Sequence, residues 1–178
     1  MNKKVKNSLL LLISLIVVNL CTQSVYKRID LTADQHFTLS EASKEIISKV
    51  NETLFIRVYL DGEFPSEFKR LQLETRQHLE ELAAENTHIK IKFESPDQQV
   101  DALIKRGMIP SKLTVEEAGK FSEAIIFPWA EISYQKKSTI VSLLSTTTLT
   151  SQEEQLQNAI ENLEYRFSNA INLITKTT

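Results

Sequence analysis

Residues 54–60 read LFIRVYL, a run rich in side chains that favour β-structure. The side chains of a strand alternate between two faces, so Ile56, Val58 and Leu60 share one face. The other face carries Phe55, Arg57 and Tyr59. The run therefore predicts a strand with one apolar face and one mixed face.

A turn, a long helix and a second strand follow this run. Apolar side chains recur at steps of three and four from about Pro65 to Glu85, which predicts a helix. The recurring residues are Phe68, Leu71, Thr75, Leu79 and Leu82. Residues 89–93, IKIKF, alternate cleanly and predict a strand with one wet face, near a sheet edge. The order strand, helix, strand is typical of α/β folds.

Further elements are predicted on both sides of this segment. Val25–Leu31 predicts a first strand, and Thr38–Glu41 has the spacing of a capping box for a helix that ends near Val50. Asp97 is expected to cap a third helix, with Gly107 at its C-terminal end. Together these elements make a β-α-β-α-β-α unit.

The pattern changes after this unit. Short strands are predicted at residues 112–116, 124–134 and 139–144, with connections that suit antiparallel pairing. Pro128 interrupts the middle strand and has no N–H to donate, which implies an edge or a bulge. A capping box at Ser151–Glu154 predicts a long helix that reaches the last residues. Residues 25–178 therefore predict an α/β fold with a mixed sheet: the β-α-β-α-β-α unit, an antiparallel β-meander and a long C-terminal helix.

This order superficially follows that of thioredoxin-like proteins. Ile109–Pro110 precedes a strand, where that fold places a cis-proline. The chain has no Cys-x-x-Cys pair, which excludes thioredoxin-type redox chemistry. The last predicted helix has a strong apolar face and no strand after it, so we expect the domain to be incomplete at its C-terminus.

The first 24 residues predict a transmembrane signal anchor. Leu9–Cys21, LLLLISLIVVNLC, carries no charge, Gly or Pro, and three lysines precede it. With its weakly polar flanks the run reaches the ~20 residues of a spanning helix, and its basic side stays in the cytoplasm. We therefore expect a single-pass anchor in the inner (cytoplasmic) membrane and a periplasmic domain at residues 25–178. A cleaved signal peptide and a lipoprotein modified at Cys21 are the alternatives.

Composition argues against several classes of function for the exported part. The net charge of the chain is −2, and removing the +3 of Lys3, Lys4 and Lys6 leaves about −5, which disfavours nucleic-acid binding. Cys21 is the only cysteine, so the domain has no internal disulfide and no thiolate. The three glycines are too far apart for a phosphate-binding loop.

No residue type occurs in a pattern that predicts a catalytic, metal-binding or cofactor-binding site. The three histidines lack ligand neighbours at short spacing, and His78 is expected to be a solvated surface residue. Adjacent carboxylates such as Glu80 and Glu81 point about 100° apart on a helix, and no Gly-x-Ser-x-Gly turn is present. We therefore expect a protein that is not an enzyme and holds no metal or cofactor.

Phe127, Pro128 and Trp129 form the most unusual local cluster. Trp129 is the only tryptophan, and a proline-bent strand beside it would present an aromatic surface to a partner. The alternative is that Trp129 belongs to the core or packs beneath a helix. These three residues are the candidate partner-binding residues.

Five stretches of the chain together resemble one known family. They are YKRIDLTADQHFTLSEASKEII (26–47), LFIRVYLDGEFPSEFKRLQLETRQHLEEL (54–82), GMIPSKLTVEE (107–117), EAIIFPWAEISY (123–134) and SQEEQLQNAIENLEYRF (151–167). They resemble the N-terminal part of the GldG family, the gliding motility-associated ABC transporter substrate-binding proteins of Bacteroidetes. The resemblance covers Val25–Thr178 and the character of the anchor.

The resemblance implies a non-enzymatic, membrane-anchored accessory subunit of an ABC transporter complex associated with gliding motility. Its implied partners are an ABC ATPase and a multispanning permease, and the ligand is unknown. The family supplies no catalytic residues to carry over. This chain stops at Thr178, before the usual end of the family. The alternative function is an exported domain that binds a small ligand or an envelope protein outside any ABC system.

Overall fold

A computed structural model describes residues 39–62, 64–97, 99–117, 120–144 and 151–176, and the side chains of these residues other than 67 and 113–124. All of them belong to one compact unit, Phe37–Thr178. The elements, in chain order, are α2 (Glu41–Ser48), β1 (Leu54–Val58), α3 (Ser66–Glu85), β2 (Ile89–Phe93), α4 (Val100–Lys105), β3 (Ser111–Glu117), β4 (Lys120–Ile126), β5 (Trp129–Tyr134), β6 (Lys137–Ser142), α5 (Gln152–Glu161) and α6 (Leu163–Thr175). The predicted strand Val25–Leu31 lies outside the described residues.

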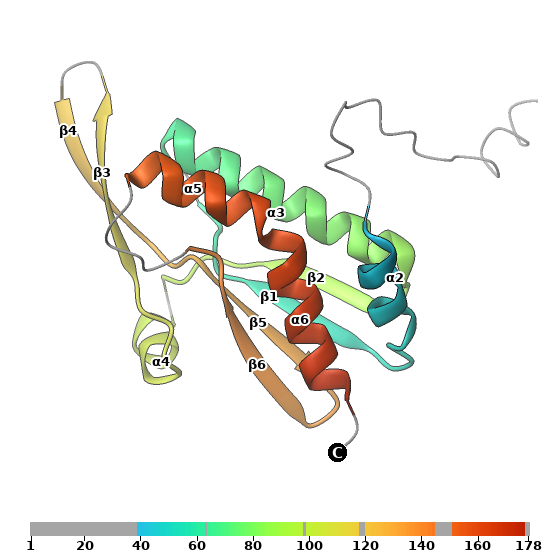
Figure 1. Ribbon diagram of the computed structural model, residues 1–178. Coiled ribbons are helices and arrows are strands. Elements are labelled where there is room, and N and C mark those ends of the chain that lie inside the picture. Colours follow the sequence, from blue (N-terminus) through green and yellow to red (C-terminus); the bar gives the residue numbers. More distant parts are fainter. Residues whose placement is uncertain (1–38, 63, 98, 118–119, 145–150, 177–178) are drawn as a thin grey trace, which may run out of the picture. The chain divides into compact units, whose positions relative to one another are not determined.

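Four strands form a mixed sheet in the order β2-β1-β5-β6 (Figure 1). β1 pairs with β2 in parallel and with β5 antiparallel, and β5 pairs antiparallel with β6. The mixed α/β class predicted from the sequence is therefore confirmed. β2 lies at an edge of this sheet, as the wet face of IKIKF predicted.

Alternation along β1 separates the two faces of the sheet. Leu54, Ile56 and Val58 are buried, whereas Phe55 and Arg57 are exposed, as predicted. The buried side chains join one core with helices α2, α3, α5 and α6. Figure 1 shows α3, α5 and α6 lying over this inner face of the sheet. The opposite face, called the outer face below, is covered at one end by α4, whose Leu103 packs with Tyr59.

Helix α2 begins later than its predicted capping box. The N-cap is Ser40, whose hydroxyl accepts a hydrogen bond from the N–H of Ser43. The reason is tertiary: the carboxylate of Glu164, on α6, accepts hydrogen bonds from the Ser40 N–H at 2.9 Å and from the Ser43 hydroxyl. The prediction of a cap at Thr38–Glu41 is therefore wrong.

The segment predicted as one strand at residues 124–134 is divided. Residues up to Ile126 pair with β3 in a separate two-stranded sheet, and residues from Trp129 pair within the main sheet. Trp129 N–H donates to Phe127 O at 2.8 Å, which closes a three-residue γ-turn around Pro128. The fixed φ of proline suits the inverse form of this turn. The turn separates β4 from β5, so the strands belong to two sheets and the predicted single meander is wrong.

The predicted long C-terminal helix is also divided. The capping box of Ser151 and Glu154 is confirmed at the start of α5, but the helix breaks at Asn162 and α6 takes a new direction. Helix α6 buries Phe167, Ile171 and Ile174 in the core with β5, β6 and α2. The expectation that the domain is incomplete at its C-terminus stays a prediction.

Helix α4 ends as predicted but begins differently. Gly107 has a φ of +89°, its N–H donates to Ile104 O at 2.9 Å, and the N–H of Met108 donates to Leu103 O at 3.0 Å, which together form a Schellman motif. Asp97 does not cap the helix, because its carboxylate accepts a hydrogen bond from the Ser95 hydroxyl at 2.6 Å instead.

Within the described ranges, no helix has both the length and the apolar character needed to cross a membrane. Leu9–Cys21 lies outside these ranges, so the signal anchor stays a prediction. No peptide bond between described residues is cis, which makes the bond before Pro110 trans.

Candidate functional site

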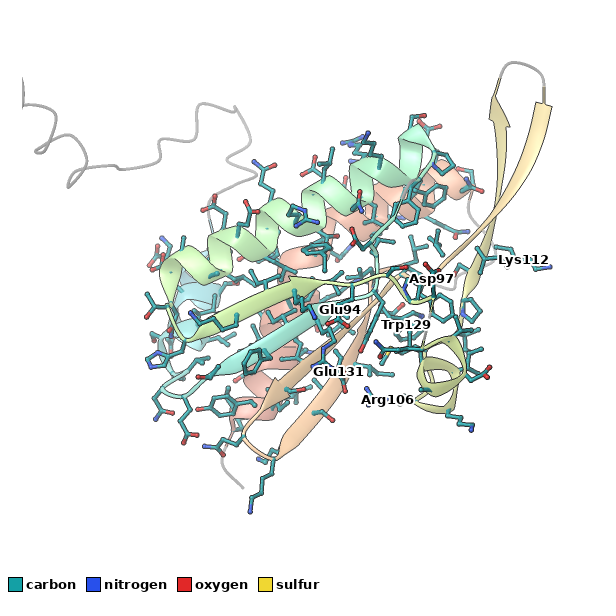
Figure 2. The ribbon with its side chains drawn as sticks, turned by 180° about the vertical axis from the view of Figure 1, so that it is seen from behind. Glu94, Asp97, Arg106, Lys112, Trp129 and Glu131 are labelled. Carbon is teal, nitrogen blue, oxygen red and sulfur yellow. The ribbon has the colours of Figure 1, made fainter. Side chains whose placement is uncertain are left out.

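The outer face of the sheet carries polar side chains in two cross-strand rows. One row is Lys92, Arg57, Glu131 and Ile140, and its neighbour is Lys90, Phe55, Ser133 and Ser138. Because strand side chains alternate, these residues all point away from the helices that cover the inner face. Figure 2 shows this outer face with α4 at one end of it.

Glu131, on β5, is the centre of the outer face and is buried. Nη1 of Arg106 lies 2.9 Å from both of its carboxylate oxygens, and Nη1 of Arg57 lies 3.3 Å from Oε2. The hydroxyl of Tyr59 donates to Oε2 at 3.2 Å. Side chains from β1, from the residue that follows it and from the C-terminal end of α4 therefore converge on one carboxylate of β5 (Figure 2). A buried carboxylate requires such partners to offset its lost hydration.

A second carboxylate extends this network to the edge strand. Glu94 follows β2 and accepts a hydrogen bond from Nζ of Lys92 at 2.7 Å, while Nε of Arg57 lies at 3.6 Å. The hydrogen bond from Lys92 holds the pKa of the Glu94 carboxyl below its usual range. Arg57 thus lies between Glu94 and Glu131, which limits the positions that its guanidinium can take.

Tyr59 connects the charged network to an apolar cluster beneath α4. Its ring is buried with Leu103, Met108 and Phe127. Burial raises the pKa of the Tyr59 phenol, so its hydroxyl stays protonated and acts as a donor at neutral pH. The cluster therefore fixes the tyrosine hydroxyl that contacts Glu131.

The network holds the Glu131 carboxylate in place with several partners. Glu131 is engaged by two guanidinium groups and a phenol, which hold its carboxylate in one position. Among the described residues no group of three His, Cys, Asp or Glu side chains is placed to hold a metal ion. The geometry, in which exposed cations lie around a buried carboxylate, suits electrostatic recognition.

The structure places the three predicted partner-binding residues at the rim of this face. Phe127 and Pro128 are buried, and Trp129 is half-buried beside the apolar cluster. The Trp129 Nε1–H donates to Ile109 O at 2.8 Å. Trp129 precedes Glu131 by two positions and so lies on the same face, whereas Phe127 lies beneath α4. Their role in partner binding stays a prediction.

His78, on α3, is not the solvated surface residue that the sequence predicted. Burial lowers its pKa to about 4, and its Nε2 is buried with no hydrogen-bond partner. The ring centroid lies 6.1 Å from that of Phe167 on α6. The prediction failed because α6, distant in sequence, covers the helix face that His78 occupies.

Polar side chains near His78 tie α6 to α2. Burial would raise the pKa of Glu164, but hydrogen bonds from Ser40 and Ser43 outweigh it and bring that pKa below its ordinary value. Ser168 Oγ donates to Ser43 Oγ at 2.8 Å. These contacts have a structural role, because they satisfy buried polar groups between two packed helices.

A separate open cavity of about 750 Å³ lies at the N-terminal ends of α3 and α5. Its lining includes Arg70, Glu153 and Glu154. Glu154 already closes the capping box of α5, and both lining carboxylates disfavour an anion there. The outer face therefore remains the candidate functional site.

Sequence reasoning did not find Glu131, Arg106 and Arg57 as a group. A usable pattern was present, since Arg57 and Glu131 are charges at alternating positions of strands whose other face is apolar. Their pairing depends on which strands are neighbours, and Arg106 joins them only because α4 folds over the sheet end.

Comparison with known proteins gives one family match. No curated protein and no solved structure matches the chain. Residues 33–133 match the family described as "Domain of unknown function (DUF7088)", a range that contains the elements from α2 to β4 and nearly all of β5. The match spans more than half of the chain, so the protein belongs to the DUF7088 family.

Proposed function

We propose that this protein is a non-enzymatic, membrane-anchored accessory subunit of an ABC transporter complex associated with gliding motility. The periplasmic α/β domain would contact other subunits or envelope proteins, and the Leu9–Cys21 segment would hold it at the inner membrane. The assignment to this system comes from the resemblance to the GldG family. The expected partners are an ABC ATPase and a multispanning permease.

One observation of the domain supports a binding role over a catalytic one. The Glu131 carboxylate is held by Arg57, Arg106 and Tyr59, and the cationic groups are more exposed than the carboxylate they hold. Such a surface presents positioned charges to a partner. An accessory subunit that acts through contacts needs a surface of this kind.

The proposal is tested by purification of the tagged full chain from gently solubilised native membranes. Mass spectrometry is expected to find an ABC ATPase and a multispanning permease enriched together, and the intact N-terminal segment on the purified chain. Recovery of a soluble chain that lacks its first ~20 residues, with neither protein enriched, would contradict the proposal.

A second function is an exported binding domain outside any ABC system. The observation that favours it is the same outer face, since that surface does not depend on an anchor or a transporter. Copurification of an envelope protein without an ATPase or permease would support this second function over the first.

A further inference from the structure

We propose that the open part of the outer face binds an acidic segment of a partner protein that also carries an apolar side chain. The surface concerned is made of Phe55, Arg57, Lys90 and Lys92, beside Glu131, and is called the β1–β2 patch. The proposal goes beyond the function proposed above in naming the partner's chemistry. It rests on that function only in assuming that the chain acts through a protein partner.

The charges of the outer face are arranged by depth. The side chains of Glu131 and Glu94 are 10% and 16% exposed. Those of Arg57, Arg106 and Lys92 are 44%, 51% and 72% exposed. The cations therefore lie toward solvent and the carboxylates lie beneath them. With the exposed Lys90, four cations face two carboxylates, so the surface that a partner meets is cationic although the chain is acidic.

An exposed aromatic ring lies beside these cations. Phe55 is 53% exposed in the middle of the sheet, paired with Lys90 on one side and Ser133 on the other. Aromatic residues, phenylalanine among them, and arginines are enriched at protein interfaces. Figure 2 shows no described helix or strand over this part of the face. A partner that covers Phe55 needs an apolar group there and carboxylates around it.

The fixed position of Arg57 favours a protein over a lipid surface. Glu94 and Glu131 flank its guanidinium at 3.6 Å and 3.3 Å, and Lys92 is paired with Glu94 at 2.7 Å. Positioned guanidinium groups match carboxylates of defined geometry, and less side-chain entropy is lost when such groups bind. Attraction to an anionic membrane depends on the number of cations and gains nothing from their fixed spacing.

The first test uses a water-soluble carbodiimide, which joins an amine to a carboxylate with no spacer. Native membranes that hold the full chain are treated, and cross-linked peptides are identified by mass spectrometry. We expect cross-links from Lys90 and Lys92 to Asp or Glu of one partner protein, and far fewer from Lys69 on α3. If Lys90 and Lys92 react with an acetylating reagent as readily as Lys69 but cross-link to no protein, the proposal is wrong.

Matched variants test the apolar part of the patch. Phe55→Ser removes the exposed ring, and Leu73→Ser on α3 removes an apolar side chain of nearly equal exposure, 53% against 55%. We expect Phe55→Ser to lower the cross-link yield about tenfold, Phe55→Leu to retain most of it, and Leu73→Ser to leave it unchanged. Trp129 fluorescence checks that each variant is folded. Equal yields from folded Phe55→Ser and Leu73→Ser variants would overturn the proposal.

A third measurement distinguishes a lipid target from a protein partner. The purified full chain is reconstituted alone into vesicles of phosphatidylglycerol or of phosphatidylcholine, and acetylation of Lys90 and Lys92 is compared. We expect equal acetylation in both. Protection in the anionic vesicles alone would assign the patch to lipid and overturn the proposal.

The outcomes also separate this proposal from the proposed function. Cross-links from Lys90 and Lys92 to a protein outside any transporter would support the patch and contradict the ABC assignment. Enrichment of an ATPase and a permease without cross-links from these lysines would support the ABC assignment and contradict the proposal for the β1–β2 patch.

Discussion

Arg106, at the C-terminal cap of α4, places Nη1 2.9 Å from both carboxylate oxygens of Glu131 on β5. The contact joins a short helix to the outer face of the sheet. Glu131 is buried while the Arg106 side chain is about half exposed, so the carboxylate depends more on the contact than the arginine does.

Removal of the Glu131 carboxylate is expected to destabilise the fold and loosen α4. Glu131→Ala leaves the Tyr59 hydroxyl without its acceptor and two guanidinium groups without their counter-charge. We expect a loss of about 1–3 kcal/mol of unfolding free energy, less than for a fully buried pair because both arginines reach solvent. Urea unfolding of the full chain in detergent measures it, with the exposed Glu80→Gln as control. An effect of Glu131→Ala no larger than that of the control would refute the structural role of the network.

His78 is expected to make the fold less stable in acid. Its pKa is about 4 in the folded protein, against 6.5 for the ordinary group. The unfolded chain therefore binds the proton first as the pH falls below about 6.5, and stability that is present at neutral pH is lost down to about pH 4. Between pH 7 and pH 5 this loss amounts to about 2 kcal/mol.

The measurement for His78 is urea unfolding at a series of pH values, for the wild type and for His78→Phe. The variant is expected to lose this part of the pH dependence, because it has no ring nitrogen to protonate. His88→Gln, at an exposed histidine, serves as the control and should keep it. An unchanged pH dependence in His78→Phe would show that another group is responsible.

Gly107 is expected to tolerate asparagine better than alanine. Its φ of +89° disfavours any side chain, although a Cβ there would meet Ile140 Cδ1 only at an ordinary 3.8 Å. The cost of Gly107→Ala is therefore backbone strain of about 1–2 kcal/mol, and Asn, which adopts this region more readily, should cost less. Thermal unfolding compares the two variants, and a neutral Gly107→Ala would show that the helix end can rearrange.

Ser151 is expected to contribute to stability through the start of α5. Its hydroxyl accepts the Glu154 N–H at 3.3 Å, and the Glu154 carboxylate accepts the Ser151 N–H at 3.1 Å. Ser151→Ala should cost about 1 kcal/mol. Ser66→Ala is the matched control, because Ser66 follows the N-cap of α3, Pro65, which makes no side-chain capping bond. Equal unfolding midpoints for the two variants would contradict this role.

Local pattern predicted most of the individual elements. The alternation of LFIRVYL and IKIKF, the apolar spacing from Phe68 to Leu82 and the Ser151 capping box all depend on neighbours within a few residues, and the structure confirms each. The Gly107 cap was predicted for the same reason.

Other features were predicted wrongly because residues distant in the sequence determine them. The N-cap of α2 is Ser40, whose N–H donates to the Glu164 carboxylate of α6. His78 is buried because α6 packs against α3. The break at Asn162 lets α6 lie against β5 and β6, a direction that helical periodicity alone does not encode.

The candidate site likewise has features that local sequence determines and features that only contacts between distant residues determine. Alternation along the strands determined that Phe55, Arg57 and Glu131 would face away from the apolar core, because adjacent side chains of a strand point to opposite faces. Only the tertiary structure decided that β1 and β5 are neighbours and that α4 brings Arg106 to Glu131. The physical reason is that strand pairing and helix packing join residues far apart in the chain, so their contacts follow from the whole core and not from any local pattern.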